Sequence, residues 1–133
     1  MPAAMRMVHD ADPAAEIMER VGDLAAVDVF ANQILLGVYK RPDKTASGIH
    51  LPDRTRDEDE YQGKVGLVLK VGPQCYVTRE NERQFSDAER VQPGQWVVMW
   101  VVDGRKILIR GQLCRVVEDY QIRMRVSEPD LVF

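Results

Sequence analysis

Few side chains in this sequence are suited to chemistry, and their spacing matches no catalytic pattern. The two histidines, His9 and His50, lie in segments with the composition of an arm and a loop. Catalysis needs a positioned nucleophile or an acid–base pair, and the chain has neither a G-x-S-x-G segment nor a cysteine–histidine signature. We therefore expect no catalytic residue and no enzymatic activity.

Acidic and sulfur-containing side chains are the remaining candidates. The acidic run at residues 57–60 could attract a divalent cation, but it lacks the alternating ligands and the glycine of a calcium-binding loop. Cys75 and Cys114 have no zinc-motif spacing, and we interpret both as small buried hydrophobes, with a disulfide between them left open. We expect no metal and no cofactor.

Composition and charge bound the class of protein. The chain has 133 residues, 45% hydrophobic and 29% charged, with a net charge of -3, which suits one folded domain plus a tail. Its longest apolar run, residues 96–102, is far shorter than the roughly 20 residues that cross a bilayer. The N-terminus also lacks the order of a signal peptide. We expect a cytoplasmic protein with no membrane and no nucleic-acid partner.

Charge is unevenly distributed along the chain. Residues 1–28 hold six acidic and two basic side chains, whereas residues 104–126 hold six basic and two acidic ones. These opposite charges could bring the two segments together, although two solvated faces are the simpler interpretation. The alternating Arg123 and Arg125 keep a nucleic-acid-binding barrel as a weaker alternative, because only Tyr120 could add an aromatic platform beside them.

The elements that must position these residues begin with a short N-terminal helix. Asp12 is suited to cap it, Pro13 to begin it and Gly22 to end it. A helix of this length is marginal in water, so it must pack on the domain or on another subunit. We interpret residues 1–28 as an arm whose contacts are its apolar residues at helical spacing: Ile17, Met18, Val21 and Leu24.

Strand patterns follow the arm. Residues 27–39 are rich in β-formers, and residues 64–71 alternate so that Val65, Leu67, Leu69 and Val71 share one face. The apolar run at 96–102 predicts a buried strand, which Asp103 and Gly104 should connect by a tight hairpin to a strand at 105–110. Short strands are also predicted at 113–117 and 122–126. The sequence thus predicts an all-β fold, a small β-barrel at residues 29–126 with a long loop at 41–62 and a tail at 127–133.

In order and spacing, five segments resemble the GroES family of small co-chaperonins. Gln95 stands where that family typically has an acid. The segments are residues 30–36 (FANQILL), 45–51 (TASGIHL), 63–73 (GKVGLVLKVGP), 91–98 (VQPGQWVV) and 118–126 (EDYQIRMRV).

The resemblance implies a GroES-like barrel that forms a heptameric ring, with its first and last strands pairing with neighbouring subunits. It also implies a non-enzymatic, co-chaperonin-like role in protein folding, in which a mobile loop contacts a chaperonin ring. Ile49 and Leu51 would be the apolar anchors, with His50 in place of the usual aliphatic middle residue. The expected partner-binding residues are Ser47, Gly48, Ile49, His50 and Leu51.

The arm, the acidic loop and the tail have no counterpart in ordinary members of that family, and they support a phage-type variant. The alternative function is therefore a bacteriophage capsid decoration or cement protein, a virion structural protein on the capsid surface that binds the major capsid protein. A co-chaperonin should need Ile49 and Leu51 and tolerate deletion of residues 1–26. A decoration protein should show the reverse.

Overall fold

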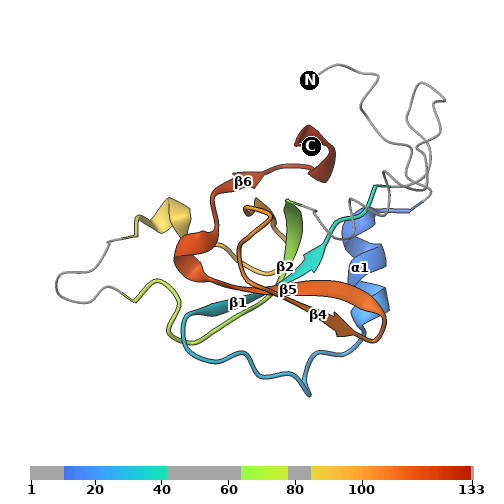
Figure 1. Ribbon diagram of the computed structural model, residues 1–133, viewed down its shortest axis with the longest axis horizontal. Helices are drawn as coiled ribbons and strands as arrows, with labels where there is room; N and C mark the ends of the chain where they lie inside the picture. The colour runs from blue at the N-terminus through green and yellow to red at the C-terminus, as the bar shows by residue number, and fades with distance from the viewer. Residues whose placement is uncertain (1–10, 42–63, 78–84, 133) are drawn as a thin grey trace.

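The described part of the chain folds into one antiparallel sheet with a single α-helix on one face (Figure 1). The computed structural model describes residues 11–41, 64–77 and 85–132. The expected all-β class is confirmed. Within these ranges the helices are α1 (Pro13–Val21) and the 3-10 turns η2 (Asp87–Glu89), η3 (Asp119–Gln121) and η4 (Pro129–Leu131). The strands are β1 (Gln33–Val38), β2 (Val65–Val71), β3 (Trp96–Val98), β4 (Arg105–Ile109), β5 (Gln112–Glu118) and β6 (Met124–Val126), in the sheet order β4-β5-β1-β2-β3-β6.

Two apolar clusters lie on the two faces of this sheet, because successive strand side chains point to opposite sides. We call them the helix-side cluster and the opposite cluster. The helix-side cluster consists of Ile17, Val21, Leu35, Tyr39, Val65, Leu67, Leu69, Trp96 and Cys114. The opposite cluster consists of Ile34, Leu36, Val38, Val68, Tyr76, Val91, Val97, Met99 and Val117.

The predicted strand at 64–71 is confirmed as β2, with one correction to its faces. Val65, Leu67 and Leu69 belong to the helix-side cluster as expected, but Val71 packs against the opposite cluster. The cause is an irregularity in the β1–β2 register, where Leu35 pairs with Lys70 and Leu36 with Val68. An extra residue in one strand of a ladder shifts the alternation beyond it.

The predicted hairpin at Asp103 and Gly104 is wrong. β3 ends at Val98 and pairs with β2 and β6, whereas β4 pairs with β5. The hairpin turn lies instead between β4 and β5, where Arg110 and Gly111 both have positive φ, of 48° and 83°. Two consecutive positive φ values are typical of the tight turns that match the twist of paired strands. Buried polar contacts of residues 100–103, described below, hold the chain away from a β3–β4 pairing.

The two edges of the sheet are β4 and β6. β1 begins only at Gln33 and pairs with β2 on one side and β5 on the other, so it has no free edge. Val27 and Val29, expected as strand residues, instead pack against the helix-side cluster ahead of β1. Of the two strands implied to pair with neighbouring subunits, only β6 lies at an edge.

The predicted helix is confirmed as α1, and it packs against the helix-side face of the sheet. Asp12 occupies the N-cap, Pro13 begins the helix, and Gly22 ends it with φ 68° and an N–H donated to the carbonyl oxygen of Met18. None of the helices in the described ranges has the length and apolarity that a membrane crossing requires.

Close packing of α1 depends on Gly37 in β1. A Cβ atom at Gly37 would lie 2.5 Å from Cγ2 of Ile17, far inside van der Waals contact. Glycine otherwise weakens a strand. Its presence at this position therefore indicates that the helix and the strand backbone approach each other directly.

Substitution of Gly37 by alanine should lower the free energy of unfolding by about 1–3 kcal/mol, because the added methyl group overpacks against Ile17. Urea unfolding measures the change. In an Ile17→Ala background the methyl group has room, so the same substitution should then cost no more than about 0.5 kcal/mol. A Gly37→Ala protein as stable as the parent would contradict the helix packing described here.

Candidate partner-binding site

The predicted partner-binding residues, Ser47 to Leu51, lie outside the described residues, but the root of their loop is well defined. Tyr39 directly follows β1, and its N–H donates to the carbonyl oxygen of Val65 at 2.9 Å. On the returning side, the N–H of Met99 donates to the carbonyl oxygen of Lys64 at 2.8 Å. The described residues on either side of 42–63 are therefore both anchored at the two central strands of the sheet.

Tyr39 also ties this root to the C-terminal tail. Its side chain is 2% exposed and its hydroxyl donates to Oδ1 of Asp130 in η4 at 2.6 Å. Its ring meets that of Trp96 edge to face, with centroids 5.5 Å apart. Asp130 is itself buried, so this is a charge-assisted hydrogen bond shielded from water. Sequence reasoning missed the pair, because the two residues are 91 positions apart and neither belongs to a motif.

Among the predicted arm contacts, the structure separates buried from exposed residues. Ile17 and Val21 are buried in the chain's own helix-side cluster, and Leu24 packs against its border. Met18 is 43% exposed. A partner approaching α1 would therefore meet Met18, whereas Ile17 and Val21 face the sheet.

Polar side chains from the β4–β5 hairpin hold the end of α1. Arg110 donates from Nη1 to the carbonyl oxygens of Val21 and Asp23. A cation at this position also complements the partial negative charge at the C-terminal end of the helix. Arg20 donates from Nη1 to Oε1 of Gln112 at 2.8 Å. Contact between the acidic arm and the basic segment thus includes guanidinium–carbonyl bonds from Arg110.

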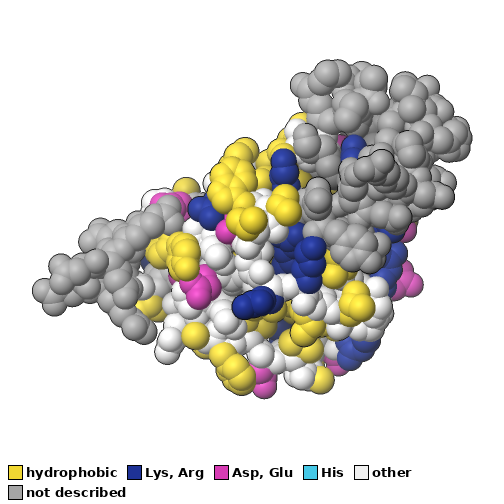
Figure 2. All heavy atoms as spheres, viewed as in Figure 1, with side chains coloured by type: hydrophobic (Ala, Val, Ile, Leu, Met, Phe, Trp, Pro, Cys, Tyr) yellow, Lys and Arg dark blue, Asp and Glu magenta, His cyan; other side chains and the backbone are white. Residues whose placement is uncertain are grey.

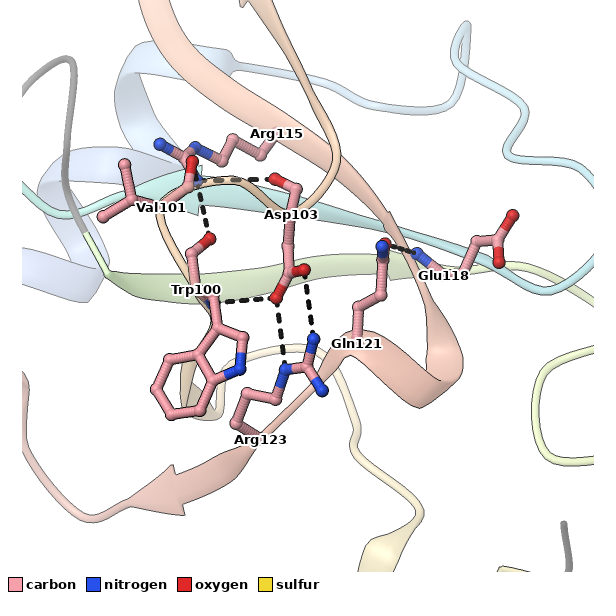
Figure 3. Close-up of polar contacts among 7 residues, drawn as sticks. All are labelled: Trp100, Val101, Asp103, Arg115, Glu118, Gln121 and Arg123. Carbon is pink, nitrogen blue, oxygen red and sulfur yellow. Dashed lines mark hydrogen bonds and ion pairs between the residues drawn. The ribbon is translucent and has the colours of Figure 1, made fainter.

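A buried polar corner forms between β3 and β4 (Figure 3). Arg115, 1% exposed, donates from Nη1 to the carbonyl oxygens of Trp100 at 3.1 Å and Val101 at 3.0 Å. The Asp103 carboxylate accepts from the N–H of Trp100 at 2.9 Å and from two nitrogens of Arg123. Burial lowers the pKa of the Arg115 guanidinium, while nearby Asp103 opposes that shift. These bonds occupy the backbone groups that a β3–β4 hairpin would have needed.

On the described part of the face shown in Figure 2, Lys and Arg side chains are interleaved with hydrophobic ones. Arg123 faces the polar corner, with its guanidinium 5.3 Å from the centre of the Trp100 ring. The acidic run at residues 57–60, where we expect no metal, lies outside the described residues, so that expectation stays a prediction.

Both cysteines are free thiols, and they pack on opposite faces of the sheet. The disulfide that the sequence left open is therefore absent from this fold. Burial raises the pKa of Cys114 to about 11, and a backbone hydrogen bond at Ile109 opposes the shift. Burial likewise raises the pKa of Cys75 to about 11. Neither thiol is poised as a nucleophile at neutral pH.

Loss of the Tyr39 hydroxyl should loosen the loop root. We expect Tyr39→Phe to lower the free energy of unfolding by about 1.5–3 kcal/mol, because Asp130 loses a buried donor. Amide hydrogen exchange at Tyr39 and Met99 should also accelerate. Tyr120→Phe, at a half-exposed tyrosine, is the matched control and should change neither quantity. Equal behaviour of the two variants would show that the tail does not support the root.

Alkaline pH should destabilise the folded chain. An unfolded thiol loses its proton near its ordinary pKa of 9.0, whereas folded Cys114 keeps it until about 11. The folded state thus binds more protons in this window, so its stability should fall as pH rises from about 9 to about 11. Urea unfolding at about pH 8 and about pH 10 measures the slope, which Cys114→Ala should reduce. An unchanged slope in that variant would assign the effect to other groups.

A comparison with known families completes the description of the site. The family described as chaperonin 10 Kd subunit matches residues 26–125. The match begins after α1 and ends within β6, so it contains the loop root and leaves α1 and η4 outside. No curated protein matches the chain.

Proposed function

Because the chain belongs to the chaperonin 10 Kd subunit family, we propose that it is a non-enzymatic co-chaperonin that assembles into a ring and contacts a chaperonin through the loop at 41–62. Ile49 and Leu51 are its apolar anchors in this proposal. The family match across residues 26–125 is the observation that carries it.

The geometry of the loop root supports this role. A binding loop that becomes ordered on contact loses conformational entropy, so it needs apolar anchors and a rigid base. Tyr39 and Lys64 provide that base, because their backbone groups are hydrogen-bonded to the central part of the sheet. Ile49 and Leu51 alternate around His50, which lets both anchors face one side of an extended loop.

Oligomer formation is supported by the edges of the sheet. An exposed edge strand is a hazard unless it is paired, covered or charged, and a closed ring pairs edges without leaving any open. We propose that residues 1–28 form an appended arm, residues 29–126 the barrel and residues 127–133 a tail. The bounds of the family match, 26 and 125, agree closely with that division.

No observation favours the capsid-decoration alternative. That function needed the arm to face outward, but Ile17 and Val21 are buried against the chain's own sheet. For the same reason, deletion of residues 1–26 does not separate the two functions, since it removes part of the core in either case.

Native mass spectrometry of the full chain with an ATP-loaded chaperonin tests the proposal. We expect an oligomer that joins the chaperonin only when nucleotide is present. The double variant Ile49→Ser, Leu51→Ser should keep the oligomer and lose at least about tenfold in affinity, because the anchors no longer bury apolar surface.

A matched control is Val102→Ser, which removes an apolar side chain that is 87% exposed at the β3–β4 corner. It should bind like the parent. A parent protein that ignores the chaperonin, or a double variant that binds equally well, would overturn the proposed function.

A further inference from the structure

A cavity of about 280 Å³ opens between the turn after β2, the 3-10 turns η2 and η3, and strand β6. Its apolar walls come from Phe85, Val91, Ile122 and Met124. Ligand cavities in proteins are roughly 300–1,000 Å³, so this one has room for a single ring-sized group. The proposed chaperonin contact does not use it.

Tyr76 lines this cavity and has an uncommon backbone conformation. Its backbone has φ 62°, a left-handed conformation that is uncommon for an aromatic residue. The Asp119 carboxylate accepts its N–H at 2.9 Å, and its ring packs edge to face on Phe85 at 5.0 Å between centroids. Backbone strain of this kind persists only where the surroundings enforce it, and it clusters at binding sites.

The hydroxyl of Tyr76 has no hydrogen-bond partner, although the side chain is only 5% exposed. Burial raises the pKa of Tyr76 to about 12. A backbone hydrogen-bonding group of Val91 lies near the hydroxyl and opposes that shift. Nearly all buried polar groups in folded proteins are paired, so a ligand atom is a physical candidate for the missing partner.

The charged groups of the cavity differ in whether they are already engaged. Asp119 accepts from Asn32 as well as from the Tyr76 backbone, and Glu89 accepts from the N–H and hydroxyl of Ser86. Arg123 is held by Asp103, as described above. The side chain of Arg125 has no hydrogen bond or ion pair with another described residue, and it is exposed at the rim. The groups of the cavity that remain available to a ligand are thus the Tyr76 hydroxyl and the Arg125 guanidinium.

We propose that this cavity binds an amphipathic acid: a ring-sized apolar body with a hydroxyl at one end, which bonds to the Tyr76 hydroxyl, and a carboxylate at the other, which pairs with Arg125. Such a group can come from a free hydroxyaryl acid.

Titrations followed by backbone amide NMR test the site with defined probes. The full probe is 3-(4-hydroxyphenyl)propionate, and 3-phenylpropionate is the comparison that lacks the hydroxyl. We expect the full probe to bind the parent protein about 3–10-fold more tightly, the worth of one net hydrogen bond. In Tyr76→Phe the difference in affinity between the two probes should disappear, because the protein no longer has a hydroxyl with which the full probe can form a hydrogen bond.

Arg125→Gln should weaken both probes about 3–10-fold, as expected for loss of a partly exposed charged partner. Arg105→Gln, at an exposed arginine of β4, is the matched control and should bind like the parent. Thermal unfolding checks that Tyr76→Phe is folded, and loss of an unpaired hydroxyl should not lower its Tm. Chaperonin binding of Arg125→Gln should be unchanged, which separates this site from the proposed function.

If neither probe shifts the resonances of Tyr76, Ile122 and Arg125, or if the hydroxyl makes no difference in the parent, the proposal is wrong.

Discussion

Strands β1 and β2 bury apolar side chains on both of their faces, and the rest of the fold depends on this constraint. Leu35 and Leu67 belong to the helix-side cluster, whereas Leu36 and Val68 belong to the opposite cluster. Each such side chain contributes about 1.5–3 kcal/mol when fully buried, so neither face can remain in water. The arm and tail cover one face. Around Tyr76 and Val91, the turn after β2 and the segment before β3 cover the other.

The same constraint decides where the segment between β1 and β2 is anchored. The long loop leaves from β1 and returns to β2, so its root lies in the best-packed part of the sheet. Tyr39 then extends the support to the C-terminal tail through Asp130. Outside the family match, α1 and η4 add cover to a sheet whose strands β1 to β5 lie within the matched residues.

Most buried polar side chains in the described part of the chain are engaged, and the two buried atoms that have no hydrogen-bond partner there are the Tyr76 hydroxyl and Nε of Arg115, whose Nη1 is bonded. Arg115 satisfies backbone carbonyls at the polar corner, and Asp119 connects Asn32 to the turn after β2. The hydroxyl of Tyr76 stands apart: it is buried, unpaired and next to a cavity. A core that placed a tyrosine there for packing alone could have used phenylalanine, because the ring would make the same contact with Phe85.

By itself the sequence determined those structural features that depend on residues close together in the chain. Asp12, Pro13 and Gly22 specify the limits of α1, and alternation in residues 65–69 specifies a strand, since these signals act within a few positions. The order of five short segments was sufficient for the family. Only the tertiary structure decided which strands pair. It moved the hairpin from Asp103 to Arg110 because Arg115, from another strand, takes the carbonyl groups of residues 100 and 101.

Likewise, only the tertiary structure placed Val71 on its face, α1 against Gly37, and Tyr39 beside Asp130. Each of these contacts joins segments far apart in the chain. Their geometry follows from a register shift, a missing Cβ atom or a buried hydrogen bond. Such features have no periodic signature in the sequence, because they arise only when the sheet has brought the segments together.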